Sequence, residues 1–391
     1  MTGSPGSGYL RGMRHCGLNG GSAARLSAGL LLALAVSAAL PQDPVLKTRT
    51  KEEREEQFNT THRITMNVQV TDASGTPVSD LRAENFSLFD NHQARKIVAF
   101  HPIDGAALSD ATEVVIVLDA VNTPPQALDE EKNAIFKYLA QSRKPFALPT
   151  AFALWFNGHL SATTATTDRN AIGRAFVKLT KKVHSNDCRS SQSPAQEKIA
   201  ANKDGGQVSP AACRAVHFKD SVAALDGIAQ RQLATGGRTL LIWVGSGWPV
   251  VPSAELERLG PKQREAYAHE FVEVLHDLRA GQVTVYSIAP RGINSTGSEN
   301  LRIADTRATA PFPRIAVDEF AQRTGGRVFT SSEDIGASLH ACIRDSEWYY
   351  SISFNAPRAQ NGSGEPHALD VKVDRPGVQV RTMDSYYTEP Q

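Results

Sequence analysis

The chain has 391 residues, of which 41% are hydrophobic, so it is long enough for two or three domains and can bury a sizeable core. It carries 42 Lys and Arg residues against 41 Asp and Glu residues. This balance argues against a strongly basic nucleic-acid-binding protein and against electrostatic attraction to anionic membranes.

The first 40 residues are predicted to be a secretory signal peptide. Arg11, Arg14 and Arg25 precede an apolar run over residues 26–36, and small residues follow at positions 37–39. A positive segment, a short apolar segment and a small-residue cleavage zone define such a signal. The run is shorter than the roughly 20 residues of a comfortable membrane span. We expect a periplasmic or secreted protein with no other membrane span. An uncleaved anchor is the alternative.

The cysteines agree with export. Cys188 and Cys213 bracket a polar insertion over about residues 184–215. In an oxidising compartment, a disulfide that closes this insertion is the expected arrangement. Cys16 would leave with the signal peptide, and Cys342 falls on a predicted helix as a buried thiol. The remaining cysteines lack paired CxxC spacing, which argues against a zinc site.

Short strands are predicted near both ends of the chain. After a charged linker over residues 41–61, alternate residues from Ile64 to Val70 are apolar, which indicates a half-buried strand. Residues 62–105 are predicted to form an N-terminal β module that is too small to be stable by itself. Residues 346–391 contain three more predicted strands. We expect these C-terminal strands to complete the module as a small β-sandwich-like unit.

Between these ends, residues 110–345 alternate predicted strands with predicted helices. The buried strands are predicted at residues 114–118, 151–156, 240–244 and 283–288. This alternation predicts an α/β fold with a doubly wound, mostly parallel sheet. Two Thr-Gly-Gly-Arg segments, at residues 235–238 and 324–327, each follow a predicted helix. Their glycines are expected to supply left-handed helix caps rather than phosphate loops.

The most informative stretch is residues 113–126. An unbroken apolar run from Val114 to Leu118 ends at Asp119, and Asn122 and Thr123 follow. Helical sequence begins directly after these polar residues. Asp119 is therefore predicted at the carboxyl end of a buried parallel strand, where open α/β sheets place their ligand sites.

Several stretches together resemble a von Willebrand factor A domain within the exported bacterial VWFA-related proteins of the acidobacterial type. They are the module opening at residues 66–91, LDAVNTP at 118–124, GRTLLIWVGSG at 237–247, WYYSISF at 348–354 and VDRPGVQVR at 373–381. The resemblance covers about residues 62–388. It implies a doubly wound, Rossmann-type A domain inserted in a β module.

Family A domains often hold Mg²⁺ or Mn²⁺ through an Asp-x-Ser-x-Ser loop, a separate Thr and a second Asp. The resemblance places Asp119 and Thr123 at two of these ligand positions. Val121 stands where the first hydroxyl belongs and cannot ligate, and Ser246 replaces the second acid. No residue near Ser221 is a confident match for the separate Thr. The resemblance therefore implies a degenerate metal site, because each lost ligand removes part of the oxygen cage.

The same residues also fit a purely structural role. Thr123 at the N-cap, Pro124 at the first helical position and Gln126 three residues after Thr123 make a capping box. Asp119 would then accept backbone N–H bonds within the loop.

Other candidate sites are weaker. His269, Glu273 and His276 share one helical face opposite an apolar stripe, which is typical of a solvated face. The segment around Ser246 has Val244 where a nucleophile elbow requires Gly. The sequence shows no Ser-His-Asp order.

These observations favour an exported, non-enzymatic, adhesion-type protein that binds another protein or a surface polymer and not nucleic acid. Asn122, Thr123 and Ser246 would lie in the binding loops, and Trp248 would be an anchor if it is exposed. The first alternative is a metal-assisted envelope hydrolase that uses Asp119. The second is a structural module of an envelope assembly.

Overall fold

A computed structural model of the chain describes residues 62–105, 112–186, 188, 210–248, 261–290, 316–330, 334–358 and 365–388. The predicted signal peptide and linker lie outside the described residues, as does most of the polar insertion. Within the described part, no helix has the length and apolar character that a membrane crossing requires.

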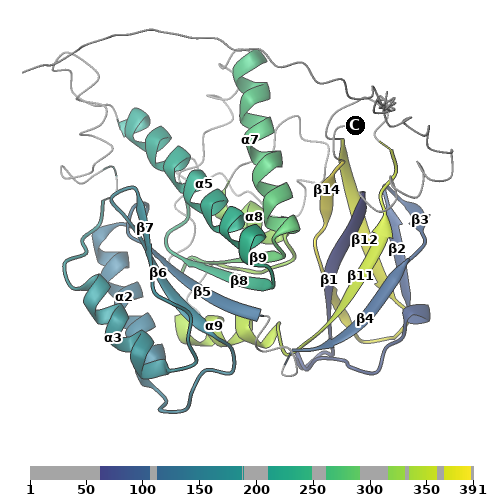
Figure 1. Ribbon diagram of the computed structural model, residues 1–391, viewed down its shortest axis with the longest axis horizontal. Helices are drawn as coiled ribbons and strands as arrows, with labels where there is room; N and C mark the ends of the chain where they lie inside the picture. Colours follow the sequence, from purple (N-terminus) through teal and green to yellow (C-terminus); the bar gives the residue numbers. More distant parts are fainter. Residues whose placement is uncertain are drawn as a thin grey trace, which may run out of the picture. The chain divides into compact units, whose positions relative to one another are not determined.

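A six-stranded sheet runs through the middle of the chain (Figure 1). Its order is β10-β9-β8-β5-β6-β7, and the pairs are parallel except for the antiparallel pair β6–β7. The strands are β5 (Thr112–Asp119), β6 (Thr150–Phe156), β7 (His159–Ala162), β8 (Arg238–Val244), β9 (Val283–Ile288) and β10 (Val328–Phe329). The predicted α/β class and mostly parallel sheet are thus confirmed.

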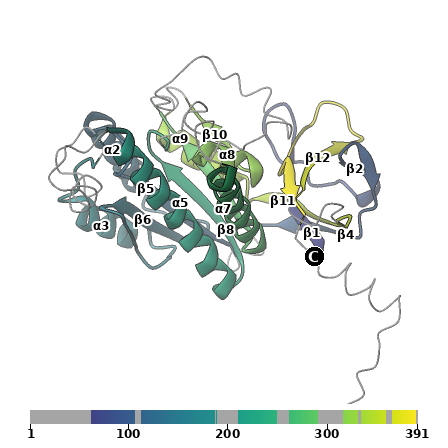
Figure 2. The same cartoon turned by 90° about the horizontal axis from the view of Figure 1, so that it is seen from above.

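Helices cover both faces of this sheet (Figures 1 and 2). One face packs on α5 (Pro210–Thr235), α7 (Pro261–Ala280) and α8 (Val317–Arg323), and the other packs on α2 (Pro125–Ala140), α3 (Arg169–Thr180) and α9 (Ile335–Arg344). Strand β5 shows why its sequence is apolar without a break. Val115 and Val117 join the first core and Val114 and Ile116 the second, so both faces of the strand are buried.

Strands from the two ends of the chain pair with one another in two further sheets. Their orders are β13-β1-β11-β4 and β14-β12-β2-β3. The strands are β1 (Arg63–Thr71), β2 (Phe86–Asp90), β3 (Gln93–Arg95), β4 (Ala99–Asp104), β11 (Trp348–Asn355), β12 (Pro366–Val373), β13 (Gln379–Arg381) and β14 (Ser385–Tyr387), with a 3-10 turn at Ala83–Asn85. We call this unit the β module. Side chains from both sheets share one apolar core, which includes Met66, Leu88, Ile352 and Val371.

The two predicted glycine caps agree with the local geometry, and an aspartate caps the start of α3. Asp168 caps α3, since its side chain accepts hydrogen bonds from the backbone N–H groups of Asn170 and Ala171. Gly236 after α5 and Gly325 after α8 both have positive φ, +73° and +80°. Both Thr-Gly-Gly-Arg segments therefore end helices by the left-handed cap that glycine favours.

Candidate functional site

Asp119 ends β5 at the carboxyl edge of the sheet and is completely buried. Its Oδ1 accepts hydrogen bonds from the backbone N–H groups of Val121 and Asn122, each at 2.9 Å. Its Oδ2 accepts from Asn122 Nδ2 at 2.8 Å and from the indole Nε1 of Trp243 at 2.9 Å. Four N–H donors thus converge on one carboxylate.

Asn122 connects Asp119 to Ser221, near which the sequence shows no confident match for the separate Thr of the family site. Its Nδ2 also donates to Ser221 Oγ at 2.9 Å, and Trp155 Nε1 donates to the same oxygen at 3.2 Å. Ser221 lies on α5 and is buried. Ser221 lies three residues after Phe218, on the face of α5 that packs on the sheet. A serine among the apolar residues of that face was the only sequence feature that could have pointed to it.

The rest of the loop is fixed from two directions. The backbone N–H of Ser246 donates to Thr123 Oγ1 at 3.1 Å, and Ser185 Oγ donates to the carbonyl of Thr123 at 2.5 Å. The backbone N–H of Asn186 donates to the carbonyl of Ala120 at 2.8 Å. The described start of the polar insertion therefore packs directly on the loop that follows Asp119.

The predicted capping box is wrong. Helix α2 begins at Pro125, its N-cap residue is Pro124, and no side chain caps it. Two consecutive prolines shift the helix start by one residue, because Pro125 takes the first helical position that the prediction gave to Pro124. The hydroxyl of Thr123 instead joins the loop to the residue after β8. The predicted backbone bonds to Asp119 are present.

The hydrogen bonds around Asp119 bear on whether its loop could hold a cation. An ion shared by Asp119 and Ser221 would lie between their oxygens, and the Asn122 amide nitrogen already bridges that position. Burial raises the pKa of Asp119, while the hydrogen bonds from Asn122, Trp243 and Val121 oppose that rise. The N–H groups thus partly offset the cost of burying this carboxylate.

Trp248 does not meet the condition for an exposed anchor. Its exposed fraction is 1%, and its ring packs edge-on to Trp243 and against Phe320 of α8. It belongs to the core because the chain after β8 turns back over the sheet face that α8 covers. Ser246 is also buried, at 2%, and Asn122 is the most accessible of the three predicted binding residues. Among the described residues, Asn122 Oδ1, Ser246 Oγ and Trp248 Nε1 have no hydrogen-bond partner.

The predicted disulfide between Cys188 and Cys213 is present. His217, one turn further along α5, lies beside it, with Nδ1 3.4 Å from Cys188 Sγ. These three side chains are close enough to surround an ion. A metal requires thiolate ligands, however, and the sulfurs are joined to each other. Cys342 is free and buried, as predicted.

The β module also contains a buried acid, which the sequence pattern did not predict. Asp90 at the end of β2 is fully buried and accepts from Arg95 Nε at 3.0 Å and Tyr386 OH at 3.1 Å. Its Oδ1 lies 2.5 Å from His367 Nδ1. The ring of Tyr386 stacks on that of His367 with centroids 5.0 Å apart. The cluster connects β2, β3, β12 and β14 of one sheet, so its role is to stabilise that sheet.

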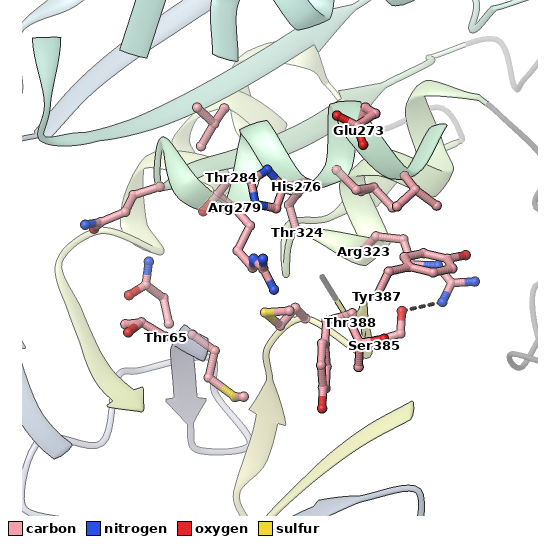
Figure 3. Close-up of a pocket in the computed structure, with 18 residues that line it drawn as sticks. Thr65, Glu273, His276, Arg279, Thr284, Arg323, Thr324, Ser385, Tyr387 and Thr388 are labelled. Carbon is pink, nitrogen blue, oxygen red and sulfur yellow. Dashed lines mark hydrogen bonds between the residues drawn. The ribbon is translucent and has the colours of Figure 1, made fainter. Parts of the chain in front are cut away.

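A small hollow lies among α7, β1 and the chain around β14 (Figure 3). Its volume is about 90 Å³, well below the roughly 300 Å³ at which ligand pockets usually begin. Arg323 contributes a cation, but it forms ion pairs with Glu319 at 2.8 Å and Asp384 at 3.7 Å and donates to Ser385. This hollow therefore has the size of a solvent pocket.

No protein-family profile matches the sequence, and no curated protein matches it. Among solved structures, manganese-loaded TRAP protein of Plasmodium vivax is 12% identical, with a TM-score of 0.33, over 73% of this chain and 96% of that chain. Human COPII-coat protein Sec24c is 8% identical, also with a TM-score of 0.33, over 81% of this chain. The match spans about half of Sec24c, 49% of its chain. Scores this low carry no functional argument.

Proposed function

We propose that this chain is an exported, non-enzymatic binding protein of the adhesion type, whose α/β domain is an A-type domain that works without an ion. The observation that carries the proposal is the complete hydrogen bonding of Asp119. Both of its oxygens accept two N–H bonds, and one donor is the buried indole of Trp243.

The same observation weighs against the hydrolase alternative. A catalytic acid must come within hydrogen-bond reach of its substrate or of a water molecule. Asp119 has an exposed fraction of 0%, and its Oδ2 already accepts hydrogen bonds from Asn122 and the indole of Trp243. An acid held in this way stabilises a loop better than it transfers protons.

Binding by such a domain does not depend on a divalent cation. In a metal-dependent A-type domain, the ion itself bridges the protein and a carboxylate of the partner. Here the loop is held by Asn122, Thr123 and backbone N–H groups, so the partner is recognised by the surface around a preformed loop. Chelation of free metal should leave this surface unchanged.

The test is sedimentation of the purified chain without its first 40 residues together with envelope fragments of the source cells. We expect saturable co-sedimentation that is the same in excess Mg²⁺ and in EDTA. Bovine serum albumin controls for trapping in the pellet. Absence of saturable binding contradicts the adhesion proposal, and binding that EDTA abolishes contradicts the ion-independent loop.

A further inference from the structure

A larger hollow than that of Figure 3 lies where β1 and β13 of the β module approach α9. Its volume is about 270 Å³, close to the lower end of the range for small-ligand pockets, roughly 300–1,000 Å³. The residues that line it include Gln69, Arg327, Arg344, Asp345, Trp348 and Arg381. None of them belongs to the loop around Asp119.

The lining of this hollow is positively charged. Arg327, Arg344 and Arg381 face a single acid among the described lining residues, Asp345. Asp345 is already paired with Arg381, whose Nη2 lies 2.6 Å from its Oδ2. Arg327 and Arg344 remain as exposed cations at the rim. Guanidinium groups bind carboxylates and phosphates with paired hydrogen bonds, so this set suits an anionic group.

The three arginines come from separate elements of the fold but line the same hollow. Burial raises the pKa of the Cys342 thiol, Asp345 raises it further, and Arg327 and Arg381 both lower it. Cys342 lies on α9, next to the hollow's Ala341. Arg327 precedes β10, Arg344 ends α9 and Arg381 ends β13, so three separate elements bring their guanidinium groups to this one hollow.

Asp345 Oδ2 has no hydrogen bond but is ion-paired with Arg381 Nη2, and three further polar atoms of the hollow's residues have no hydrogen-bond partner in the described part of the chain. They are Gln69 Oε1, Trp348 Nε1 and Arg381 Nη1. Gln69 has an exposed fraction of only 3%. Buried polar atoms nearly always have a partner, and here two donors and one acceptor remain. An anion with hydroxyl groups would complement all three, because the anion accepts from Arg381 and Trp348 while a hydroxyl donates to Gln69.

We propose that this hollow binds a small polyhydroxy carboxylate of the size of one acidic sugar residue. Its carboxylate lies against Arg381, Arg327 and Arg344 and accepts a hydrogen bond from Trp348, and one of its hydroxyl groups donates to Gln69. That the ligand comes from an acidic polymer of the cell surface rests on the proposed function. The chemistry of the ligand is inferred from the hollow alone. It gives the adhesion-type protein a recognition site on the β module side, away from Asp119.

The test is calorimetric titration of sodium glucuronate into the chain without its first 40 residues, with glucose and inorganic phosphate as matched probes. Glucose retains the hydroxyl groups but lacks the charge, whereas phosphate carries the charge on a smaller group. We expect saturable binding of glucuronate and at least about tenfold weaker binding of both other probes, since charge-assisted hydrogen bonds are the strong ones.

Two exposed arginines give variants that should fold. We expect Arg344→Gln and Arg327→Gln each to weaken glucuronate binding about tenfold. Arg174→Gln, on the outer surface of α3, is the matched control and should bind as the wild type does. Equal affinity in all four proteins overturns the proposal, as does glucose or phosphate binding as tightly as glucuronate, or no glucuronate binding by the wild type.

The two proposals fail separately. Saturable envelope binding without glucuronate binding removes the sugar-acid site but keeps the adhesion function. Glucuronate binding that depends on Arg344, in a protein that does not bind envelopes, keeps the site and removes the polymer as its source.

Discussion

At the scale of single residues, Asp119 organises the loop that follows β5. It is a buried acid whose four partners all donate through N–H groups, and one of them lies 124 residues away. Its position after an unbroken apolar run could be predicted from the sequence. Its partner Trp243 could not, because nothing local indicates which indole reaches across from the neighbouring strand.

Replacing Asp119 with Ala should destabilise the protein strongly. The substitution leaves two buried backbone N–H groups, an amide and an indole without their acceptor, and we expect a loss of about 3 kcal/mol or more. Asp168→Ala is the matched control, because Asp168 also accepts two backbone N–H bonds but lies at an exposed helix N-cap. That control should lose about 1 kcal/mol. Urea unfolding measures both, and equal losses would contradict the account.

Cys342 gives a second prediction at this scale. Its thiol is buried, and burial raises its pKa well above the ordinary value of a cysteine. Alkylation requires the thiolate, so iodoacetamide at about pH 8 should leave Cys342 unmodified in the native protein and modify it after unfolding in urea. Peptide mass mapping reads the two states. Modification at equal rates in both would show that this thiol is accessible.

At the scale of elements, the sequence predicted those features that depend on residues close together in the chain. The alternation from Ile64 to Val70 predicted β1, and glycine after two helices predicted their left-handed ends. The Thr123 capping box was wrong by one residue, because a second proline competes for the first helical position. The cluster around Asp90 was missed because its members lie on strands from the two ends of the chain.

The Asp90 cluster should contribute substantially to the stability of the β module. Asp90→Ala removes the acceptor of Arg95 and Tyr386 and the partner of His367, and losing one member of such a buried set typically costs about 3–5 kcal/mol. The control is Asp80→Ala, which breaks an exposed pair with Arg375 and should change the unfolding free energy little. Similar midpoints in urea for the two variants would contradict the structural role.

At the scale of the whole molecule, the chain closes its β module only after the α/β domain is complete. Strand β11 pairs with both β1 and β4, and β12 pairs with β2. The α/β domain, by contrast, builds its two apolar cores almost entirely from residues 114–343. The strands β1, β2 and β4, within residues 63–104, therefore depend on strands within residues 348–381 for ladder partners.

A chain that ends after residue 345 should separate these units. We expect residues 62–105 to lose protection from hydrogen exchange, because β1, β2 and β4 have lost their partner strands. The strands β5, β6 and β8 should stay protected. Hydrogen-exchange mass spectrometry on the full-length and shortened chains compares them peptide by peptide. Unchanged protection of residues 62–105 would refute this dependence.

In the proposed ion-free loop, N–H donors and not a cation balance the charge of Asp119. The most direct test is calorimetric titration of Mg²⁺ and Mn²⁺ into the chelator-stripped chain without its first 40 residues, with Asp119→Ala alongside. The account predicts no saturable heat in either protein. Saturable binding by the wild type that Asp119→Ala abolishes would contradict it and would assign Asp119 to a working metal site.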